Sequence, residues 1–381
     1  MMPRSPDLGL YIHIPFCHAR CGYCDFVTFT GKEDKIDGYV GDLCREIGLY
    51  GGKSPHTPLL QRGDSGGISI STIFFGGGTP SVLEPRHLSQ IFAAIRSHFK
   101  LKPNAEITLE ANPESITPGK AKSWKDSGIN RLSIGLQAYD DALLKSMGRL
   151  HNVQQFEAAY RVVRAAGFDN VSFDLIYGFP EQTLESWQNT VRSAAALAPE
   201  HLSLYSLTVE EHTPFAAAGI QVDADLQADM YDWARKYLQT TGFEQYEISN
   251  FARAGKACRH NLIYWRKQDY LGLGAGAIGC KGNLRWTNQK TLPAYHEDIH
   301  AGRLPRLSIE TLDPDTHRFE KLMLGLRLRE GFAWGEENNA AWLASRSTLH
   351  KQGLLEEIQP GRWRIPDAVV PLTNQILLPF L

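Results

Sequence analysis

The chain has 381 residues, of which 43% are hydrophobic and 22% charged, a balance typical of a soluble globular protein with two or three domains. The net charge of −2 provides no basic field for nucleic acid or an anionic membrane, and no apolar run reaches membrane-spanning length. The first ten residues lack the apolar core of a signal peptide and three of the six cysteines cluster, so we expect a cytoplasmic setting.

Six apolar, β-branched runs occur within residues 10–207, and most are followed by a helical pattern. We predict strands at residues 10–14, 68–75, 105–109, 131–136, 171–176 and 202–207. Between the second and third runs, one helical face carries Leu88, Ile91, Phe92, Ile95 and Phe99. Strands that alternate with helices predict a parallel sheet of βα units, and near-continuous apolar strands fit a sheet covered on both faces.

Unusual residues fall at or just past the C-terminal ends of these runs. Three cysteines follow the first run and three glycines the second, while Glu110 ends the third and Gln137 the fourth. This edge carries the ligand site of β/α barrels and of doubly wound sheets. Because six units are too few for a full eight-stranded barrel, the sequence predicts an α/β fold with a partial, open (β/α)6 barrel of the TIM type.

The pattern changes around and after the barrel. Residues 51–67 are rich in Gly, Pro and Ser, which predicts a surface loop. Residues 223–241 read as a helix and residues 246–251 as another strand. A loop is predicted over 258–265, and the glycine-rich run 272–276 is read as a tight loop, because no helix with a downstream acid follows to make it a nucleotide fingerprint.

From about residue 312 the chain is helical again, and a short β-like pair follows at 363–365 and 369–372. A helix-rich module with a small ribbon resembles a winged helix. Without a strongly basic face we expect it to serve in packing or as a lid and not in DNA binding. The predicted parts are a partial barrel over 1–222, a connecting segment over 223–300 and a smaller α+β domain over 301–381.

Cys17, Cys21 and Cys24 have the spacing C-x3-C-x2-C. Three close thiolates can hold three irons of a [4Fe–4S] cluster and leave the fourth iron open, as a catalytic site needs. A zinc site with His13 or His18 as fourth ligand is an alternative, although neither histidine completes a familiar zinc spacing. A local disulfide is disfavoured in a chain without secretory features.

Other polar residues carry weaker signals when taken singly. The three glycines at 76–78 would let the backbone approach a ligand closely, or would simply form a tight turn. Glu110 and Gln137 could be solvent-facing residues at strand ends. Asp174 lies within an apolar run, where a buried carboxylate needs a partner. Arg149 could be that partner, or could hold a ligand carboxylate.

A second motif, HNxxYW, comprises His260, Asn261, Tyr264 and Trp265. A neutral imidazole is a common axial ligand of haem iron, and the two aromatic side chains offer apolar faces to a macrocycle. Cys258 could be a second or alternative ligand. The competing interpretation is a structural segment in which His260 bonds the backbone and Trp265 lies in the core.

The cysteine motif resembles the signature of the radical SAM superfamily, where the open iron binds the amino and carboxylate groups of S-adenosylmethionine (SAM). The segments YIHIPFC, FFGGGTPS, LEANPE, IGLQ, GRLH, DLIYGFPEQT and YEISNFA together resemble the oxygen-independent coproporphyrinogen III oxidase family over most of residues 9–265. The resemblance implies that Cys17, Cys21 and Cys24 hold the cluster. It implies SAM contacts from Tyr11, Tyr23, Gly77, Gly78, Thr79, Glu110, Gln137, Arg149 and Asp174.

Two departures separate this chain from the decarboxylating oxidases. Those enzymes carry a fourth cysteine two residues after the third, where this chain has Phe26, and a longer extension than the sixteen residues that precede Cys17 here. The HNxxYW motif marks a related group of haem chaperones, HemW, which implies haem contacts from His260, Tyr264 and Trp265. Relatives usually have His-Ser where this chain has Ile278 and Gly279.

The resemblance therefore implies a HemW-type protein that binds a [4Fe–4S] cluster, SAM and haem and delivers haem to respiratory enzymes. Haem-accepting respiratory proteins would be its partners, with transient membrane contact, and no nucleic acid. One alternative is oxidative decarboxylation of coproporphyrinogen III by radical SAM chemistry, against which Phe26 and the short N-terminus count. Another is a radical SAM enzyme for a different substrate, with HNxxYW merely structural. Both binding and turnover of SAM are compatible with the sequence.

Overall fold

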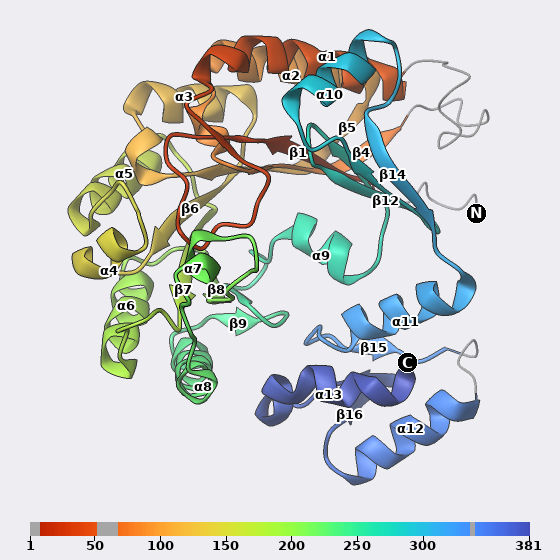
Figure 1. Cartoon of the computed structure of the whole chain (residues 1–381). Helices are drawn as coiled ribbons and strands as arrows, with labels where there is room; N and C mark the ends of the chain where they lie inside the picture. Colours follow the sequence, from red (N-terminus) through yellow and green to blue (C-terminus); the bar gives the residue numbers. More distant parts are fainter. Residues whose placement is uncertain (1–7, 52–67, 336–339) are drawn as a thin grey trace.

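The computed structural model of the chain describes residues 8–51, 68–335 and 340–381. Six parallel strands form its centre, each at one of the predicted runs. These are β1 (Leu8–Ile14), β4 (Ser69–Gly77), β5 (Lys100–Ala111), β6 (Arg131–Gln137), β7 (Val171–Tyr177) and β8 (His201–Ser206). The sheet curves but its two end strands do not pair, so the predicted open, partial barrel is confirmed (Figure 1).

Helices cover the convex face of this sheet (Figure 1). They are α1 (Ile36–Gly51), α2 (Pro85–His98), α3 (Pro118–Ser127), α5 (Val153–Ala165), α6 (Leu184–Ala196) and α8 (Ala224–Thr240). The short α4 (Asp141–Ser146) and α7 (Pro214–Ala217) pack instead in a separate apolar cluster that includes Tyr23 and Phe179. The predicted stripe of α2 is buried, and Phe92 packs edge-on against Phe75 of β4 at 5.6 Å. Helix α8 confirms the helix predicted over 223–241. Apart from Gly51, which ends α1, the predicted loop over 51–67 lies outside the described residues.

The predicted strand over 246–251 is wrong. In its place are two short antiparallel strands, β9 (Glu244–Gln245) and β10 (Asn250–Ala252), which extend the sheet beyond β8. The chain turns between them because the buried Glu247 carboxylate accepts hydrogen bonds from the Ser249 backbone N–H at 2.8 Å and from the Asn250 side chain. A carboxylate buried away from water requires such donors, and a straight strand would not supply them.

The loop predicted over 258–265 is also wrong, because Arg259–Trp265 form helix α9. Glu106 of β5 accepts the backbone N–H of Arg259 at 3.1 Å and of His260 at 3.0 Å. A carboxylate at this position satisfies orphan donors and complements the positive end of the helix dipole. The residue that starts α9 thus comes from a strand about 150 positions earlier, which local sequence patterns do not reveal.

Residues after α9 widen the sheet on the other side of β1. Strands β11 (Tyr270–Leu273), β12 (Ile278–Lys281), β13 (Leu284–Asn288) and β14 (Arg306–Thr311) follow one another outward, and α10 (Leu292–His300) lies against α1. The run 272–276 turns tightly, as predicted: Gly274 and Gly276 have positive φ values of 97° and 79°. A Cβ on Gly272 would lie 2.0 Å from the Ile278 carbonyl oxygen, so no side chain fits there.

A smaller α+β domain closes the chain. It contains α11 (Pro314–Gly325), α12 (Ala340–Lys351), α13 (Thr373–Leu377) and a three-stranded antiparallel sheet of β15 (Phe332–Ala333), β17 (Arg362–Arg364) and β16 (Glu356–Gln359). The predicted pairing of 363–365 with 369–372 is wrong, because Asp367–Leu372 form a 3-10 helix. Pro371 lacks the N–H that a ladder needs, and β17 pairs with β16 and β15.

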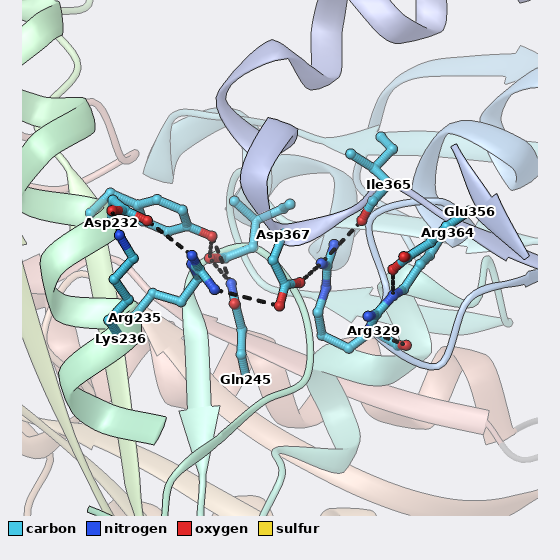
Figure 2. A network of polar contacts seen from close by, with 11 residues as sticks. Asp232, Arg235, Lys236, Gln245, Arg329, Glu356, Arg364, Ile365 and Asp367 are labelled. Carbon is cyan, nitrogen blue, oxygen red and sulfur yellow. Dashed lines mark hydrogen bonds and ion pairs between the residues drawn. The ribbon is translucent and has the colours of Figure 1, made fainter. Parts of the chain in front are cut away.

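Asp367 connects this domain to the barrel. Its carboxylate accepts one hydrogen bond from Arg329 at 2.5 Å and another from Arg235 of α8 at 3.4 Å (Figure 2). Arg235 is further held by Asp232 at 2.9 Å. Both arginines are largely buried, so the bridge fixes the C-terminal domain beside α8. Among the described residues, no helix is long and apolar enough to cross a membrane.

Candidate cluster, cofactor and haem sites

The cysteine loop is fastened to the glycine-rich turn after β4. The backbone N–H of Gly78 donates to the Ile14 carbonyl at 2.9 Å, and that of Thr79 donates to the Phe16 carbonyl at 2.8 Å. The Thr79 hydroxyl donates to the sulfur of Cys17 at 3.3 Å. Cys17 itself lies in the short strand β2 (Phe16–Cys17), which pairs with β3 (Phe29–Thr30). Two segments more than 60 residues apart are thereby joined at the strand ends.

Cys17, Cys21 and Cys24 are partly exposed, carry free thiols and line one cavity of about 390 Å³. Among the described residues, their three sulfur atoms do not all lie within 4.8 Å of one another, as the ligands of a single metal ion would. A cluster of several iron atoms is wider than one ion and accommodates sulfurs that lie further apart. Burial raises the pKa of the Cys17 thiol to about 11, opposed by the hydrogen bond from Thr79. Thiolates at this position therefore need the positive charge of bound metal, and the set fits three ligands of a [4Fe–4S] cluster.

The glycines beside the cysteines leave no room for side chains. Gly77 has a φ of 111°, and a Cβ there would lie 2.5 Å from the ring of His13. A Cβ on Gly78 would lie 2.8 Å from the Phe16 carbonyl oxygen and 3.0 Å from the sulfur of Cys17. Glycine is therefore required at both positions by the tight packing of this turn against the cysteine loop, and both glycines line the cavity.

Two carboxylates line the same cavity from β5 and β7. Burial, with the charge of Asp174, raises the pKa of Glu110 to about 8, and burial also raises the pKa of Asp174. Asp174 accepts the Ser133 hydroxyl at 3.0 Å, and Glu110 accepts the Gly77 backbone N–H at 3.3 Å. A pair of raised acids favours a ligand that brings positive charge, such as an ammonium or sulfonium group.

Gln137 is held in an unusual conformation at the end of β6. Its φ is 69°, its side chain is 8% exposed, and its amide oxygen lacks a hydrogen-bond partner within the described protein. Strained backbone and an unpaired buried acceptor are both uncommon away from functional sites. Since Gln137 lines the cavity, a ligand donor there would satisfy it.

Arg149 completes the cavity wall and reaches the cysteine loop. Its guanidinium donates to the Asn112 side-chain oxygen at 2.7 Å and to the sulfur of Cys21 at 3.6 Å. Asn112 in turn donates to the Thr79 hydroxyl at 3.2 Å. Asn112 is a cavity residue that our sequence reasoning missed, although it lies in the segment LEANPE; Ser133 and Tyr205 were missed as well.

Tyr23 forms an apolar wall, with its ring edge-on to Phe179 at 5.7 Å and near Phe215 at 6.2 Å. The cavity thus combines three thiols, a glycine turn, two acids and an aromatic wall, which fits an amino-acid-bearing nucleoside such as SAM beside a cluster. Tyr11 is the exception among the predicted contacts, because it does not line this cavity; its hydroxyl bonds His13 at 3.0 Å.

His260 of the HNxxYW motif is 1% exposed, and both of its ring nitrogens have partners. Nδ1 lies 2.7 Å from the Thr72 hydroxyl and Nε2 lies 2.8 Å from the Tyr264 hydroxyl. The ring stacks on Phe74 at 5.3 Å, and burial lowers its pKa to about 3, so it is neutral. In this arrangement neither nitrogen is open to an added ligand.

Other residues near the motif divide between two hollows. Tyr264 lines both a groove of about 600 Å³, shared with Tyr11 and Phe26, and a smaller hollow of about 270 Å³, which Trp265 also lines. Cys258 is buried and its thiol donates to Glu106 at 3.6 Å. The structure therefore brings Tyr264 and Trp265 to accessible surfaces, and keeps His260 and Cys258 inside.

The large groove adjoins the cysteine cavity. Phe26 and Asp25 line both, so Phe26 stands between them. Strand β5 connects the two regions in a second way, because Glu106 at the start of α9 and Glu110 at the cavity lie on the same face, four residues apart. Helix α9 lies between the sheet and α11 (Figure 1).

The amino-acid sequence is similar to a known family and to named proteins from other organisms. The family model of the radical SAM superfamily matches residues 11–194. A protein from Synechocystis named "Heme chaperone HemW" is 37% identical over 86% of this chain and 79% of its own length. A protein of the same name from Mycobacterium tuberculosis is 35% identical over 97% of this chain and 95% of its own length.

Among solved structures, coproporphyrinogen III oxidase (HemN) from Escherichia coli matches with a TM-score of 0.83. The match covers 99% of this chain and 90% of that one, at 23% sequence identity. This likeness establishes a shared fold across the barrel and the C-terminal domain together.

Proposed function

The chain belongs to the radical SAM superfamily and, within it, to the HemW family, and on this premise we propose that it is a haem chaperone. It would bind haem beside a [4Fe–4S] cluster and SAM and deliver the haem to respiratory proteins. We place it in the cytoplasm, where a reducing environment preserves a cysteine-held cluster. Acceptors that reside in a membrane would require transient contact with that membrane.

Radical SAM proteins hold a [4Fe–4S] cluster and SAM, and the cavity residues suit both. Cys17, Cys21 and Cys24 would hold the cluster, while the backbone at 77–79 and the unpaired oxygen of Gln137 would bind the amino-acid part of SAM. When bound, the cluster would supply the electron for any reductive cleavage of SAM. The protein's own part is to orient SAM and to balance its charge with Glu110 and Asp174.

The single observation that carries the haem proposal is the groove of about 600 Å³ at Tyr264, adjoining the cysteine cavity. Its volume lies within the range of roughly 300–1,000 Å³ that is typical of cofactor sites. Phe26 stands at its border with 65% of its surface exposed, where the oxidases resembled in sequence carry a cysteine. An exposed phenylalanine there provides apolar surface for a porphyrin face and no further metal ligand.

The test is anaerobic reconstitution of the cluster followed by two assays on the same preparation. Haem is titrated and followed by its Soret absorbance, and coproporphyrinogen III is incubated with SAM and a reductant. We expect haem to bind in a 1:1 ratio, and no protoporphyrinogen to form. Formation of protoporphyrinogen at catalytic turnover would overturn the chaperone proposal, and so would a failure to bind haem by a protein that binds cluster and SAM.

A further inference from the structure

We propose that Tyr264, and not His260, provides the iron ligand for haem, and that His260 is a positioning residue behind it. The inference deepens the proposed function, on which it rests, by identifying the atom that holds the cargo. It assigns the haem to the groove lined by Tyr264 and Phe26. A histidine within a haem motif is the ordinary expectation for the ligand, and the geometry of helix α9 argues against it.

Exposing His260 would require several favourable contacts to break together. The ring would have to leave Thr72 and Tyr264, with bonds of 2.7 and 2.8 Å, and its stacking partner Phe74. The helix that carries it is fixed by Glu106 at its first turn, so it cannot simply rotate outward. Each buried group left without its hydrogen bond carries a desolvation penalty, which a haem–imidazole bond would have to offset.

Tyr264 lies one helical turn after His260, and its side chain lines the groove. A tyrosine oxygen is an established type of protein ligand for haem iron. The other ligand atoms at the groove are less suitable. Tyr11 also lines the groove and bonds His13, but Nε2 of that ring must keep its proton for the Val27 carbonyl, so loss of the Tyr11 proton would leave an unpaired phenolate or a charged imidazole. His13 is 4% exposed, and its two nitrogens are bonded to the Tyr11 hydroxyl at 3.0 Å and the Val27 carbonyl at 2.8 Å. Tyr270 packs edge-on against Tyr264 at 4.6 Å, but no histidine among the described residues is hydrogen-bonded to its hydroxyl.

The contact between Tyr264 and His260 lets the phenol lose its proton without burying a charged imidazole. In one of the two tautomers that these contacts allow, the Tyr264 O–H donates to Nε2 and Nδ1–H donates to the Thr72 oxygen. On binding, the oxygen–iron bond forms and the phenol O–H bond breaks. Because the Thr72 hydroxyl can donate as well as accept, the ring proton can move to Nε2, which then donates to the phenolate oxygen. One proton leaves to solvent, and His260 stays neutral.

The groove has a polarity that suits haem. Phe26, Ile278 and Leu307 line it with 65%, 45% and 54% of their surfaces exposed, so apolar area faces solvent when the groove is empty. Such exposed apolar surface marks binding sites more often than chance. Lys290 lies at the rim, where its ammonium would pair with a propionate. Apolar walls with a cation at the edge match a flat macrocycle with two carboxylates.

The experiment is resonance Raman spectroscopy of the full-length protein with cluster and ferric haem bound, because an iron–phenolate bond has its own vibrational signature. The wild type is compared with Tyr264→Phe, with the matched control Tyr270→Phe, and with His260→Gln. We expect an iron–phenolate signature in the wild type and in Tyr270→Phe. Tyr264→Phe should lose it, with haem affinity falling about tenfold, while His260→Gln should keep it at a shifted frequency.

The outcomes separate this inference from the proposed function. A wild-type spectrum with imidazole ligation and no phenolate signature would overturn the assignment of Tyr264, whatever the variants do. An unchanged spectrum in Tyr264→Phe would overturn it as well, and leave haem binding intact. Absence of haem binding by wild type would overturn both. Circular dichroism and SAM binding confirm that each variant is folded before its spectrum is interpreted.

Discussion

The cysteine cavity and the HNxxYW motif differ in whether their polar groups already have hydrogen-bond partners within the protein. In the cavity, the oxygen of Gln137 is unpaired, and Glu110 and Asp174 have raised pKa values. In α9, by contrast, His260 is saturated by hydrogen bonds within the protein. The cavity is therefore preformed for a ligand, whereas a haem bound as we propose would require the bonds of Tyr264 and His260 to be exchanged on loading and on release. A carrier benefits from that exchange, because a site that holds haem too well cannot pass it on.

The largest effect is expected from a side chain in the glycine turn. Gly78→Ala should abolish retention of the cluster, because its Cβ would lie 3.0 Å from the sulfur of Cys17 and 2.8 Å from the Phe16 carbonyl oxygen. Iron content after reconstitution measures the loss. Gly119→Ala in helix α3 is the matched control, since its Cβ would meet nothing within 4 Å. A Gly78→Ala protein with full iron content would contradict the preformed cavity.

The second largest effect is expected at Glu106, whose replacement should disturb helix α9 but not the cysteine cavity. Glu106→Gln replaces an acceptor of two backbone N–H groups of α9 by an amide, and should lower the free energy of unfolding by ~2 kcal/mol. Haem affinity should fall with it, while SAM affinity stays unchanged. Urea unfolding and calorimetric titration of SAM measure the two. Thr117→Ala, which removes the cap of α3 at Lys120, is the control that costs stability but spares haem binding. Equal losses of SAM and haem affinity would mean that the regions are not separable.

A smaller effect concerns pH. The folded-state pKa of Glu110 is raised to about 8 from 4.5, so the native protein without ligands holds an extra proton between these values and loses stability as pH rises through them. Glu110→Gln should remove that loss and so raise the free energy of unfolding by ~2 kcal/mol above pH 8. Glu114, whose pKa is lowered, gives the opposite slope: its stabilisation is present above its unfolded pKa and is lost as pH falls. Unfolding curves across pH test both signs, and a flat wild-type profile would contradict the account.

The smallest effect is expected from removal of the unpaired amide oxygen of Gln137. Gln137→Met keeps the side-chain length but deletes the unpaired amide oxygen, so it should stabilise the ligand-free protein by ~1 kcal/mol. SAM affinity should fall in the same variant, because the acceptor for a ligand donor is gone. Thermal unfolding without ligand and titration with SAM would show the two changes in opposite directions. A loss of stability would indicate that the oxygen has a partner in solution.

Much of the barrel was predictable because its signals are local. Each of the six runs is a continuous apolar strand, and the cofactor residues follow the strand ends, where topology gathers them. Asn112 was missed because an isolated amide has no spacing signal. Helix α9 was missed for a different reason: Glu106, which caps it, lies in another strand. The state of His260 was equally hidden, since Thr72 and Phe74 surround it only after folding.

The central claim, delivery of haem, is tested most directly by the rate at which loaded protein transfers haem to an apo-form respiratory haem protein. Stopped-flow absorbance is recorded at increasing acceptor concentration and compared with spontaneous loss to excess apomyoglobin. A chaperone that hands haem over by contact predicts a rate that rises with acceptor concentration and exceeds spontaneous loss. A rate equal to spontaneous loss at every acceptor concentration would contradict the account.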